Sequence, residues 1–207
     1  TKVPDGSVGM AGIGCHFMAQ WMDRRTDTYT HMGAEGANWI GQAPFTETQH
    51  IFQNIGDGTY FHSGSMAISA TVASGVNITY KILYNAAVAM TGGQDAAGAL
   101  PIPALTRKLE AEGVRRTIVV AEDPTKYRQA QLASNAEVRN REALDAAQRE
   151  LREIPGTTVL IYDQQCAAEK RRHRKRGKLA EPSLRVIINE AVCEGCGDCG
   201  VKSNCLS

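Results

Sequence analysis

The alternation of apolar and polar residues along the chain predicts strands and helices in turn. Short runs rich in β-branched and apolar residues predict three strands, at 78–84, 117–121 and 157–163. Helical spacing of small or apolar residues occupies about 63–73, and a second helical segment begins near Pro103 and stops at Gly113. This order of elements is typical of an α/β fold with a parallel sheet.

The longest helical pattern covers 136–153. We expect Asn135 to cap it, and its apolar stripe consists of Leu144, Ala147, Leu151 and Ile154. Opposite charges lie four positions apart in two pairs, Glu137 with Arg141 and Asp145 with Arg149. We interpret this helix as scaffold.

A further strand is expected immediately before Asp57, because a helix pattern and the strand at 78–84 follow it. Parallel strands need a crossover of a dozen or more residues, and 27 residues separate Asp57 from Asn85. The segment therefore predicts one right-handed βαβ unit. For the whole chain we expect an α/β fold, a mostly parallel sheet with helices on both faces.

Polar residues mark both ends of that unit, Gly56-Asp57-Gly58 at the first and Asn85 at the second. Ligands of open α/β sheets bind beyond the carboxyl ends of the strands, where both groups belong. One carboxylate, one amide oxygen and one backbone carbonyl suit Mg²⁺, which usually completes its shell with water and substrate phosphates. Glycines beside Asp57 let backbone N–H groups approach a diphosphate. An ordinary Asp-Gly turn is the alternative.

The length of 207 residues suffices for one sizeable core and an appendage. No apolar stretch is long enough to span a membrane and no secretory signal opens the chain, so we expect a cytoplasmic protein. The first eight residues are expected to form a linker. A start at Thr1 instead of Met suggests a piece of a longer protein.

The net charge of +1 hides a basic segment. Residues 170–178 contain seven Lys or Arg, so the remainder of the chain carries −6, seven less than the whole. Basic clusters bind phosphate backbones, but a run without interleaved aromatic residues is more typical of a solvated or protein-facing surface. We therefore expect no nucleic-acid binding. The segment suits the docking of an acidic electron carrier.

Six cysteines without a secretory signal indicate metal or redox chemistry rather than disulfides. The last fifteen residues hold four of them, Cys193, Cys196, Cys199 and Cys205. Three closely spaced thiolates and a fourth nearby favour a [4Fe–4S] cluster over a zinc site. The five-residue gap before Cys205 leaves open whether it binds the same cluster.

A glycine-rich segment covers 9–16. Dinucleotide binding is rejected, because no apolar strand is expected before this segment and Phe17 stands where the third glycine belongs. By residue type alone, Cys15 suits a buried free thiol. The segment 28–45 has no sustained period and is interpreted as a loop, in which Glu35 is expected to be a solvated carboxylate.

The Gly-Asp-Gly motif, followed just under thirty residues later by Asn, resembles the metal and diphosphate motif of thiamine diphosphate enzymes. The run at 89–94, Ala-Met-Thr-Gly-Gly-Gln, resembles a narrower group, the 2-oxoacid:ferredoxin oxidoreductases. Across 12–94 the sequence looks most like the indolepyruvate ferredoxin oxidoreductases, particularly those fused into one long chain. Ala86 departs from that family, where an acidic residue is expected, but the metal ligands lie on either side of it.

The resemblance implies a site for thiamine diphosphate and Mg²⁺. The metal ligands would be Asp57, Asn85 and the Ala87 carbonyl. The residues expected at the cofactor are Ile13, Gly14, Cys15, His16, His31, Gly56, Gly58, Ala89 and Met90. Cys15 and Cys166 would bind an iron–sulfur cluster beside thiamine, whose other two ligands the family places upstream of the glycine-rich segment.

By the same resemblance, 1–183 is the diphosphate-side thiamine domain and 184–207 begins a small ferredoxin-like cysteine-rich segment. The parent enzyme would oxidise and decarboxylate 2-oxoacids such as aryl pyruvates to acyl-CoA, using coenzyme A, and pass electrons through [4Fe–4S] clusters to ferredoxin. We expect a homo-oligomer that needs further domains, including the one that activates the aminopyrimidine, so no catalytic residue is assigned here. The alternatives are a non-catalytic iron–sulfur electron-transfer module and a basic nucleic-acid-binding domain.

Overall fold

The computed structural model of the chain describes residues 1–85, 87–88, 92–184 and 187–197. Contacts divide the chain into two compact units, Thr1–Lys170 and Arg171–Ser207. Helix α6, Ala167–Lys175, includes the boundary between them. The domain boundary expected at residue 183 stays a prediction.

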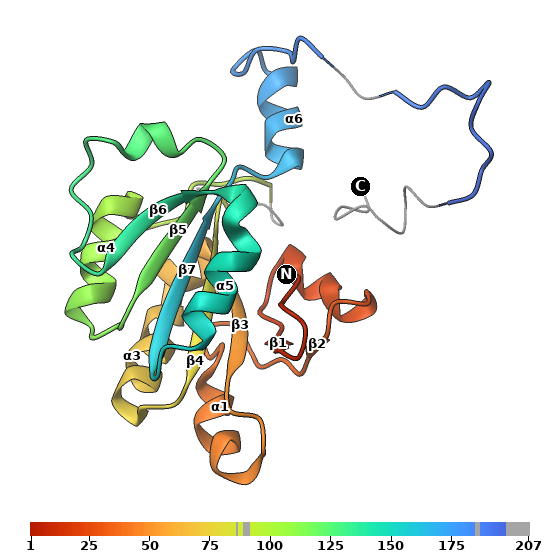
Figure 1. The fold of residues 1–207 in the computed structure, drawn as a ribbon. Helices are drawn as coiled ribbons and strands as arrows, with labels where there is room; N and C mark the ends of the chain where they lie inside the picture. The colour runs from red at the N-terminus through yellow and green to blue at the C-terminus, as the bar shows by residue number, and fades with distance from the viewer. Residues whose placement is uncertain (86, 89–91, 185–186, 198–207) are drawn as a thin grey trace. The chain divides into compact units, whose positions relative to one another are not determined.

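The first unit is built on one sheet of seven strands, all paired in parallel (Figure 1). Across the sheet the order is β2-β1-β3-β4-β7-β5-β6. The strands are β1 Val8–Met10, β2 Thr26–Asp27, β3 Ile51–Gly56, β4 Ile78–Tyr84, β5 Thr117–Ala121, β6 Ala136–Asn140 and β7 Thr157–Asp163. Because parallel strands point the same way, their carboxyl ends share one rim of the sheet.

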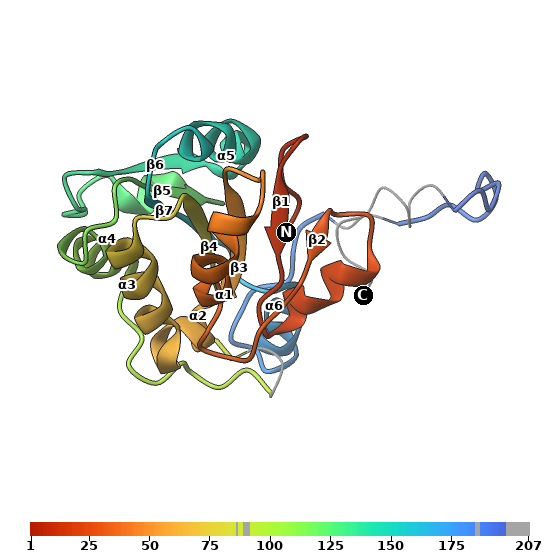
Figure 2. The same ribbon diagram turned by 90° about the horizontal axis from the view of Figure 1, so that it is seen from below.

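Helices cover both faces of this sheet (Figure 2). The larger core takes side chains from three helices, α1 Ala37–Gln42, α3 Ser65–Ser74 and α4 Ile102–Ala111. The smaller core takes side chains from α5, Leu144–Arg152. Alternate residues of β5 divide between the two, with Val119 in the larger core and Ile118 and Val120 in the smaller. The predicted α/β fold is confirmed.

Short helical turns lie between the longer elements. They are η1 Cys15–Trp21, η2 Ala43–Phe45, α2 Asp57–Thr59, η3 Tyr60–Gly64, η5 Pro124–Tyr127 and η6 Arg141–Ala143. The turns α2 and η3 lead directly into α3, and η3 is a π-helix. The helix after β3 therefore starts at Asp57 and ends at Ser74, with an irregular first part.

The three strands predicted from apolar runs are confirmed with their bounds unchanged, as β4, β5 and β7. The expected βαβ unit is β3, α3 and β4, with β3 and β4 in parallel register. At the amino-terminal end the prediction is wrong in two respects. Val8 begins a strand instead of ending a linker, and this short strand includes the first residues of the glycine-rich segment, 9–10. Three residues give too short a pattern for the sequence to indicate it.

The predicted helix over 136–153 is also wrong in its first part. Residues 136–140 form the edge strand β6, and the helix α5 begins at Leu144. Asn135 does not cap this helix; its side-chain amide donates to the Val114 carbonyl over 2.7 Å, whereas Asn140 accepts the Glu142 N–H over 3.0 Å at η6. The expected pair of Asp145 with Arg149 is present at 2.7 Å.

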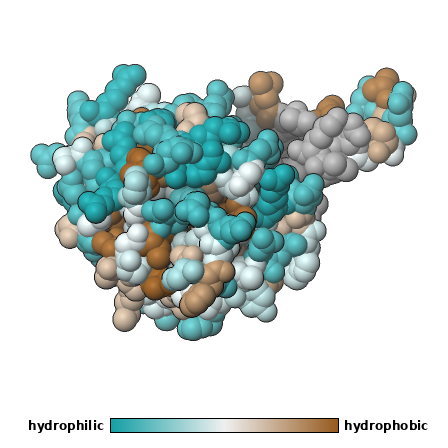
Figure 3. All heavy atoms as spheres, turned by 60° about the horizontal axis from the view of Figure 1, so that its bottom comes forward, coloured by the Kyte–Doolittle hydropathy of each residue, from teal (hydrophilic) through white to brown (hydrophobic). Residues whose placement is uncertain are grey.

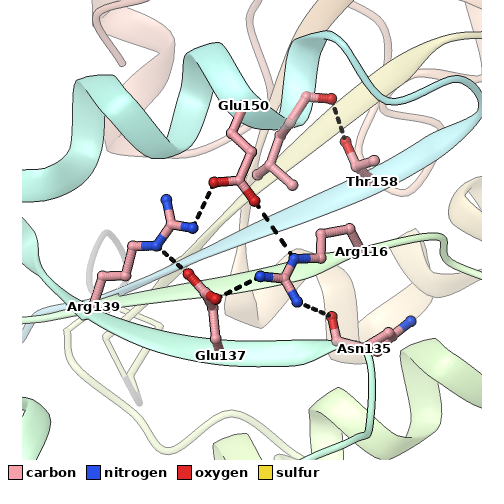
Figure 4. Close-up of polar contacts among 7 residues, drawn as sticks. Arg116, Asn135, Glu137, Arg139, Glu150 and Thr158 are labelled. Atoms are coloured by element: carbon pink, nitrogen blue, oxygen red, sulfur yellow. Dashed lines mark hydrogen bonds and ion pairs between the residues drawn. The ribbon is translucent and has the colours of Figure 1, made fainter.

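Glu137 does not pair with Arg141 but joins an ion-pair network between β6 and α5 (Figure 4). Its carboxylate contacts Arg139 and lies 2.5 Å from the Arg116 guanidinium. Glu150 of α5 completes the network, at 2.5 Å from Arg139 and 3.6 Å from Arg116. The alternating charges that looked like a helix face are thus the polar face of an edge strand.

A polar row crosses the middle of the sheet on the strands around β4. The ring of His50 bonds the Thr79 hydroxyl over 2.7 Å, and Thr79 bonds Thr158 over 2.8 Å. Lys81 lies on β4, the strand that also carries Thr79. It is only 1% exposed and donates to the Lys2 carbonyl over 2.8 Å. Burial lowers the pKa of Lys81 from 10.5 to about 7. The sheet therefore holds an amine that gives up its proton easily.

Unit 2 consists of the end of α6 and the tail that follows. The apolar residues of 184–189 also predict a short strand, but the described residues of that range, 184 and 187–189, form none. Large apolar side chains are exposed in the tail, among them Leu184 at 87% and Ile187 at 83%.

On the face drawn in Figure 3, apolar residues form small areas between hydrophilic ones. No helix within the described ranges is long and apolar enough to cross a membrane.

Candidate thiamine diphosphate site

Asp57 and Asn85 lie side by side at the carboxyl rim of the sheet, as the βαβ unit predicts. Asp57 follows β3, and its Oδ2 accepts the backbone N–H of Asn85, which follows β4, over 2.9 Å. The other oxygen of Asp57 accepts the Gly58 N–H over 2.8 Å, and Asn85 Oδ1 accepts the Ala87 N–H over 2.9 Å. Asp57 is 2% exposed. Backbone donors therefore hold both side chains in place.

The neighbouring residues keep this corner narrow. Gly58 faces Val88, whose methyl carbon would lie 3.2 Å from a Cβ at position 58. Gly56 ends β3 in an extended conformation, with the ring of His16 3.6 Å from where its Cβ would be. Burial, followed by the charges of Asp57 and Asp163, raises the pKa of Tyr84. Ala89 and Met90 lie outside the described residues.

Beyond β1, the rest of the glycine-rich segment, 11–16, bends against β3. A Cβ on Gly12 would overlap the Asn54 carbonyl, and one on Gly14, whose φ is 150°, would lie 2.8 Å from the His16 ring. Burial, followed by the charge of the chain's amino terminus, lowers the pKa of His16 from 6.5 to about 4. Its buried Nε2 has no hydrogen-bond partner among the described residues. The ring is therefore neutral, with one nitrogen available.

The loop after β2 carries His31 and Glu35, and Glu35 contacts the glycine-rich segment. His31 is exposed, and its Nδ1 lies 3.4 Å from the Thr30 hydroxyl. The prediction of a solvated Glu35 is wrong, because this side chain is 0% exposed. Its Oε2 accepts the Gly33 N–H over 2.7 Å and its Oε1 accepts the Ile13 N–H over 3.3 Å. These donors come from two different loops, which a sequence pattern does not show.

Sequence reasoning missed two further residues of this corner. Thr59 donates from its hydroxyl to the Ile13 carbonyl over 3.4 Å, and Tyr80 donates from its hydroxyl to the Glu35 carbonyl over 3.0 Å. The sequence offered one signal for the folded loop, the glycines Gly33 and Gly36 on either side of Glu35. In the structure both glycines have positive φ. Positive φ at two such positions marks a tightly folded loop rather than a flexible connection.

A cavity of about 360 Å³ opens beside Asn85, over the ends of β4, β5 and β7. It is lined by Tyr84, Asn85, Glu122, Asp123, Lys126, Asp163, Gln164, Gln165 and Lys170. Four of its five charged side chains are paired within the wall: Lys170 lies 2.8 Å from Glu122, and Lys126 contacts Asp163. Tyr127 donates to Asp163 over 2.7 Å. Three carboxylates and two ammonium groups leave the lining with one net negative charge.

The cysteines that are described are free thiols. Cys15 is exposed at the start of η1, and Cys166 is partly buried between β7 and α6. Cys193 and Cys196 are exposed in the tail, and Cys199 and Cys205 lie outside the described residues. Within the described ranges, no three His, Cys, Asp or Glu side chains gather as a metal site. The proposed cluster ligands thus stay predictions.

The residues present fit Mg²⁺ and a diphosphate by their chemistry. Asp57 and Asn85 offer one carboxylate and one amide oxygen, the hard ligands that Mg²⁺ prefers, and each oxygen has lone pairs beyond its bond to a backbone N–H. Gly56 has room beside His16, since a Cβ there would lie 3.6 Å from the ring, whereas the ring itself fills the space beside Gly14. The unpartnered His16 Nε2 supplies a polar contact for a ligand there.

Residues 8–162 match the family model of the thiamine pyrophosphate enzyme C-terminal TPP binding domain. The chain therefore belongs to this family of thiamine pyrophosphate-binding domains. It is also similar, at 26% identity over 201 residues, to the indolepyruvate oxidoreductase subunit IorA of Thermococcus kodakarensis. The match covers 90% of this chain and 29% of that protein.

Two solved structures share the fold. A 2-oxoglutarate:ferredoxin oxidoreductase from Magnetococcus marinus, with 2-oxoglutarate, coenzyme A and succinyl-CoA bound, superposes with a TM-score of 0.55 at 19% identity, over 77% of this chain and 54% of that one. A protein from Mycobacterium smegmatis assigned as a thiamin diphosphate-dependent enzyme gives 0.53 at 17%, over 79% and 29%. The predicted resemblance to the thiamine-dependent oxidoreductases is confirmed.

Proposed function

We propose that this chain holds the diphosphate end of thiamine diphosphate in a 2-oxoacid:ferredoxin oxidoreductase of the indolepyruvate type. The observation that carries the proposal is the contact of Asp57 with Asn85 across β3 and β4. The similarity to an indolepyruvate oxidoreductase subunit supports the choice of substrate class, an aryl pyruvate.

In this proposal Asp57, Asn85 and the Ala87 carbonyl bind Mg²⁺, and Mg²⁺ binds the diphosphate. Gly56 and Gly58 let the backbone approach the phosphate oxygens. The other residues proposed to line the cofactor are Ile13, Gly14, Cys15, His16, His31, Ala89 and Met90. Bound thiamine diphosphate supplies the nucleophilic carbon that attacks the carbonyl of the 2-oxoacid. The chain's own residues orient the cofactor and exclude water from its diphosphate.

The electrons released in the reaction need a path of iron–sulfur clusters. We assign Cys15 and Cys166 to a cluster beside the cofactor, and Cys193, Cys196, Cys199 and Cys205 to a [4Fe–4S] cluster in the tail. Coenzyme A takes the acyl group and ferredoxin takes the electrons. The basic helix α6 and its continuation, 170–178, suit an acidic electron carrier because of their seven cationic side chains. The parent enzyme is a homo-oligomer with further domains in this proposal.

Isothermal titration with thiamine diphosphate and Mg²⁺ tests the assignment. Wild type is expected to bind only when Mg²⁺ is present, and Asp57→Ala, which removes the charged ligand, is expected to bind about 100-fold more weakly, roughly 2.7 kcal/mol. Asp23→Ala, at an exposed position, is the matched control and should bind as wild type does. Equal affinity of wild type and Asp57→Ala would refute the metal site. An electron-transfer module or a nucleic-acid binder would not bind the cofactor at all.

A further inference from the structure

Glu35 connects two loops that come from different strands of the sheet. Its carboxylate accepts the Ile13 N–H, in the loop after β1, over 3.3 Å, and the Gly33 N–H, in the loop after β2, over 2.7 Å. Its own backbone carbonyl accepts the hydroxyl of Tyr80, on β4, over 3.0 Å. The side chain is 0% exposed. Two loops and the side chain of Tyr80, from the first half of β4, therefore meet at this one residue.

The Glu35 carboxylate is buried and is held by backbone donors. Moving an ionised carboxylate out of water has a large free-energy cost, which its partners in the protein must recover. Among the residues the structure describes, no Lys, Arg or His lies within ion-pair distance of Glu35. Two backbone N–H groups satisfy it instead. An apolar side chain at position 35 would leave both N–H groups without this acceptor, so the carboxylate is the group that ties the two loops together.

The opposite side of Ile13 is tied to the helix that begins at Asp57. Thr59 donates from its hydroxyl to the Ile13 carbonyl over 3.4 Å. Gly33, on the far side of Glu35, is packed so closely on Ser63 of the same helical segment that a Cβ there would overlap the serine side chain. The glycine-rich loop is thus held between Glu35 and the turn that carries the proposed metal ligand.

We propose that Glu35 is a positioning residue, which fixes Ile13 so that the following residues, Gly14 to His16, present their polar groups to the diphosphate. This inference rests on the proposed function. Both backbone groups of Ile13 are committed within the protein, its N–H to Glu35 and its carbonyl to Thr59. The cofactor contact expected of Ile13 is therefore left to its side chain, and polar contact falls to the next three residues.

The test compares Glu35→Gln with Tyr80→Phe in the full chain. Glu35→Gln keeps one acceptor oxygen but places an NH₂ group against the other backbone N–H. Tyr80→Phe removes the hydrogen bond to the Glu35 carbonyl and leaves the bond to Ile13 in place. Glu35→Gln is expected to weaken thiamine diphosphate binding about tenfold, and Tyr80→Phe less than about twofold. Hydrogen exchange at the Ile13 amide should speed up about tenfold in Glu35→Gln alone.

Measuring metal binding and cofactor binding separately distinguishes a positioning role from a merely structural one. Mn²⁺, followed by electron paramagnetic resonance, should bind Glu35→Gln as it binds wild type, since Asp57 and Asn85 are untouched, while general loosening would weaken both. If Glu35→Gln does not fold, Thr59→Val provides the test, because it removes the bond from the Thr59 hydroxyl to the Ile13 carbonyl. The affinity for thiamine diphosphate is then expected to fall about threefold.

The outcomes separate the two proposals. If wild type binds the cofactor, Asp57→Ala does not, and Glu35→Gln binds as wild type does, the positioning role is wrong and the proposed function stands. Wild type that does not bind thiamine diphosphate with Mg²⁺ overturns both.

Discussion

Asp57 Oδ2 accepts the backbone N–H of Asn85 over 2.9 Å, although 28 positions separate the two residues. The donor is a main-chain group, so it persists whatever side chain stands at 85. The two roles of Asn85, supporting Asp57 and binding the metal through Oδ1, are therefore separable by mutation.

Asn85→Ala is expected to lower the affinity for thiamine diphosphate with Mg²⁺ about tenfold, roughly 1.4 kcal/mol, by removing a neutral metal ligand. The melting temperature of the ligand-free protein should fall by no more than about 2–4 °C, because the main-chain bond to Asp57 remains and only the bond from the Ala87 N–H to Oδ1 is lost. Titration calorimetry and differential scanning calorimetry measure the two effects. A large loss of stability with unchanged affinity would assign Asn85 a structural role only.

The tail cysteines are expected to bind one cluster independently of the thiamine site. Anaerobic reconstitution with iron and sulfide should give brown protein, and Cys196→Ser should lose most of this colour while the affinity for thiamine diphosphate stays that of wild type. Cys205→Ser decides whether that residue belongs to the same cluster. Zinc without iron after reconstitution would show that the cluster assignment is wrong.

Cys15 and Cys166 are expected to share a second cluster, with sulfurs on the order of 6 Å apart. Loss of either ligand of one cluster removes the same irons, so Cys15→Ser, Cys166→Ser and the double variant should lose equal amounts of iron. Additive losses would indicate separate sites. An experimental structure with these sulfurs more than roughly 12 Å apart would exclude a shared cubane.

Lys81 makes stability depend on pH in the alkaline range. Its folded pKa of about 7 lies below the unfolded value, so the unfolded chain binds more protons between those values and the free energy of unfolding rises from pH 7 toward 10. Lys81→Met should flatten this rise and stabilise the protein at pH 7 by on the order of 2 kcal/mol. Urea unfolding at several pH values measures it; a Lys81→Met variant with the wild-type slope contradicts the assignment.

The network of Arg116, Glu137, Arg139 and Glu150 fastens α5 to the edge strand β6 (Figure 4). Its side chains are roughly a quarter to two fifths exposed, so solvent screens each pair. A double-mutant cycle of Arg139→Ala with Glu150→Ala should give a coupling of about 0.5–1 kcal/mol in urea unfolding. The exposed pair Asp145 with Arg149 is the control, with about 0.3 kcal/mol expected. Coupling at or below that control would leave the network without a role in stability.

The central strands follow from the sequence because burial on both faces leaves continuous apolar runs, as in Val119 and its neighbours. The edge strand β6 does not, because Glu137 and Arg139 alternate with Val138 and their partners come from Arg116 and α5. Charges with distant partners cannot be told from charges spaced along a helix.

At the site, Asp57 and Asn85 were predictable because a parallel crossover brings strand ends together whatever the details of packing. The burial of Glu35 was not, since its acceptor oxygens are satisfied by the Ile13 and Gly33 amides, and any residue type except proline offers such a donor. Contacts made through the main chain leave no mark in the pattern of side chains.

The position of β7 has a consequence for how this chain is made. Although it is the last strand in sequence, it lies between β4 and β5 and pairs with both. A growing polypeptide that stops before Thr157 has β2-β1-β3-β4 and β5-β6 as separate pieces, each with an unpaired edge, and such edges invite wrong pairing. During synthesis the two halves therefore become one sheet only after Asp163 has left the ribosome.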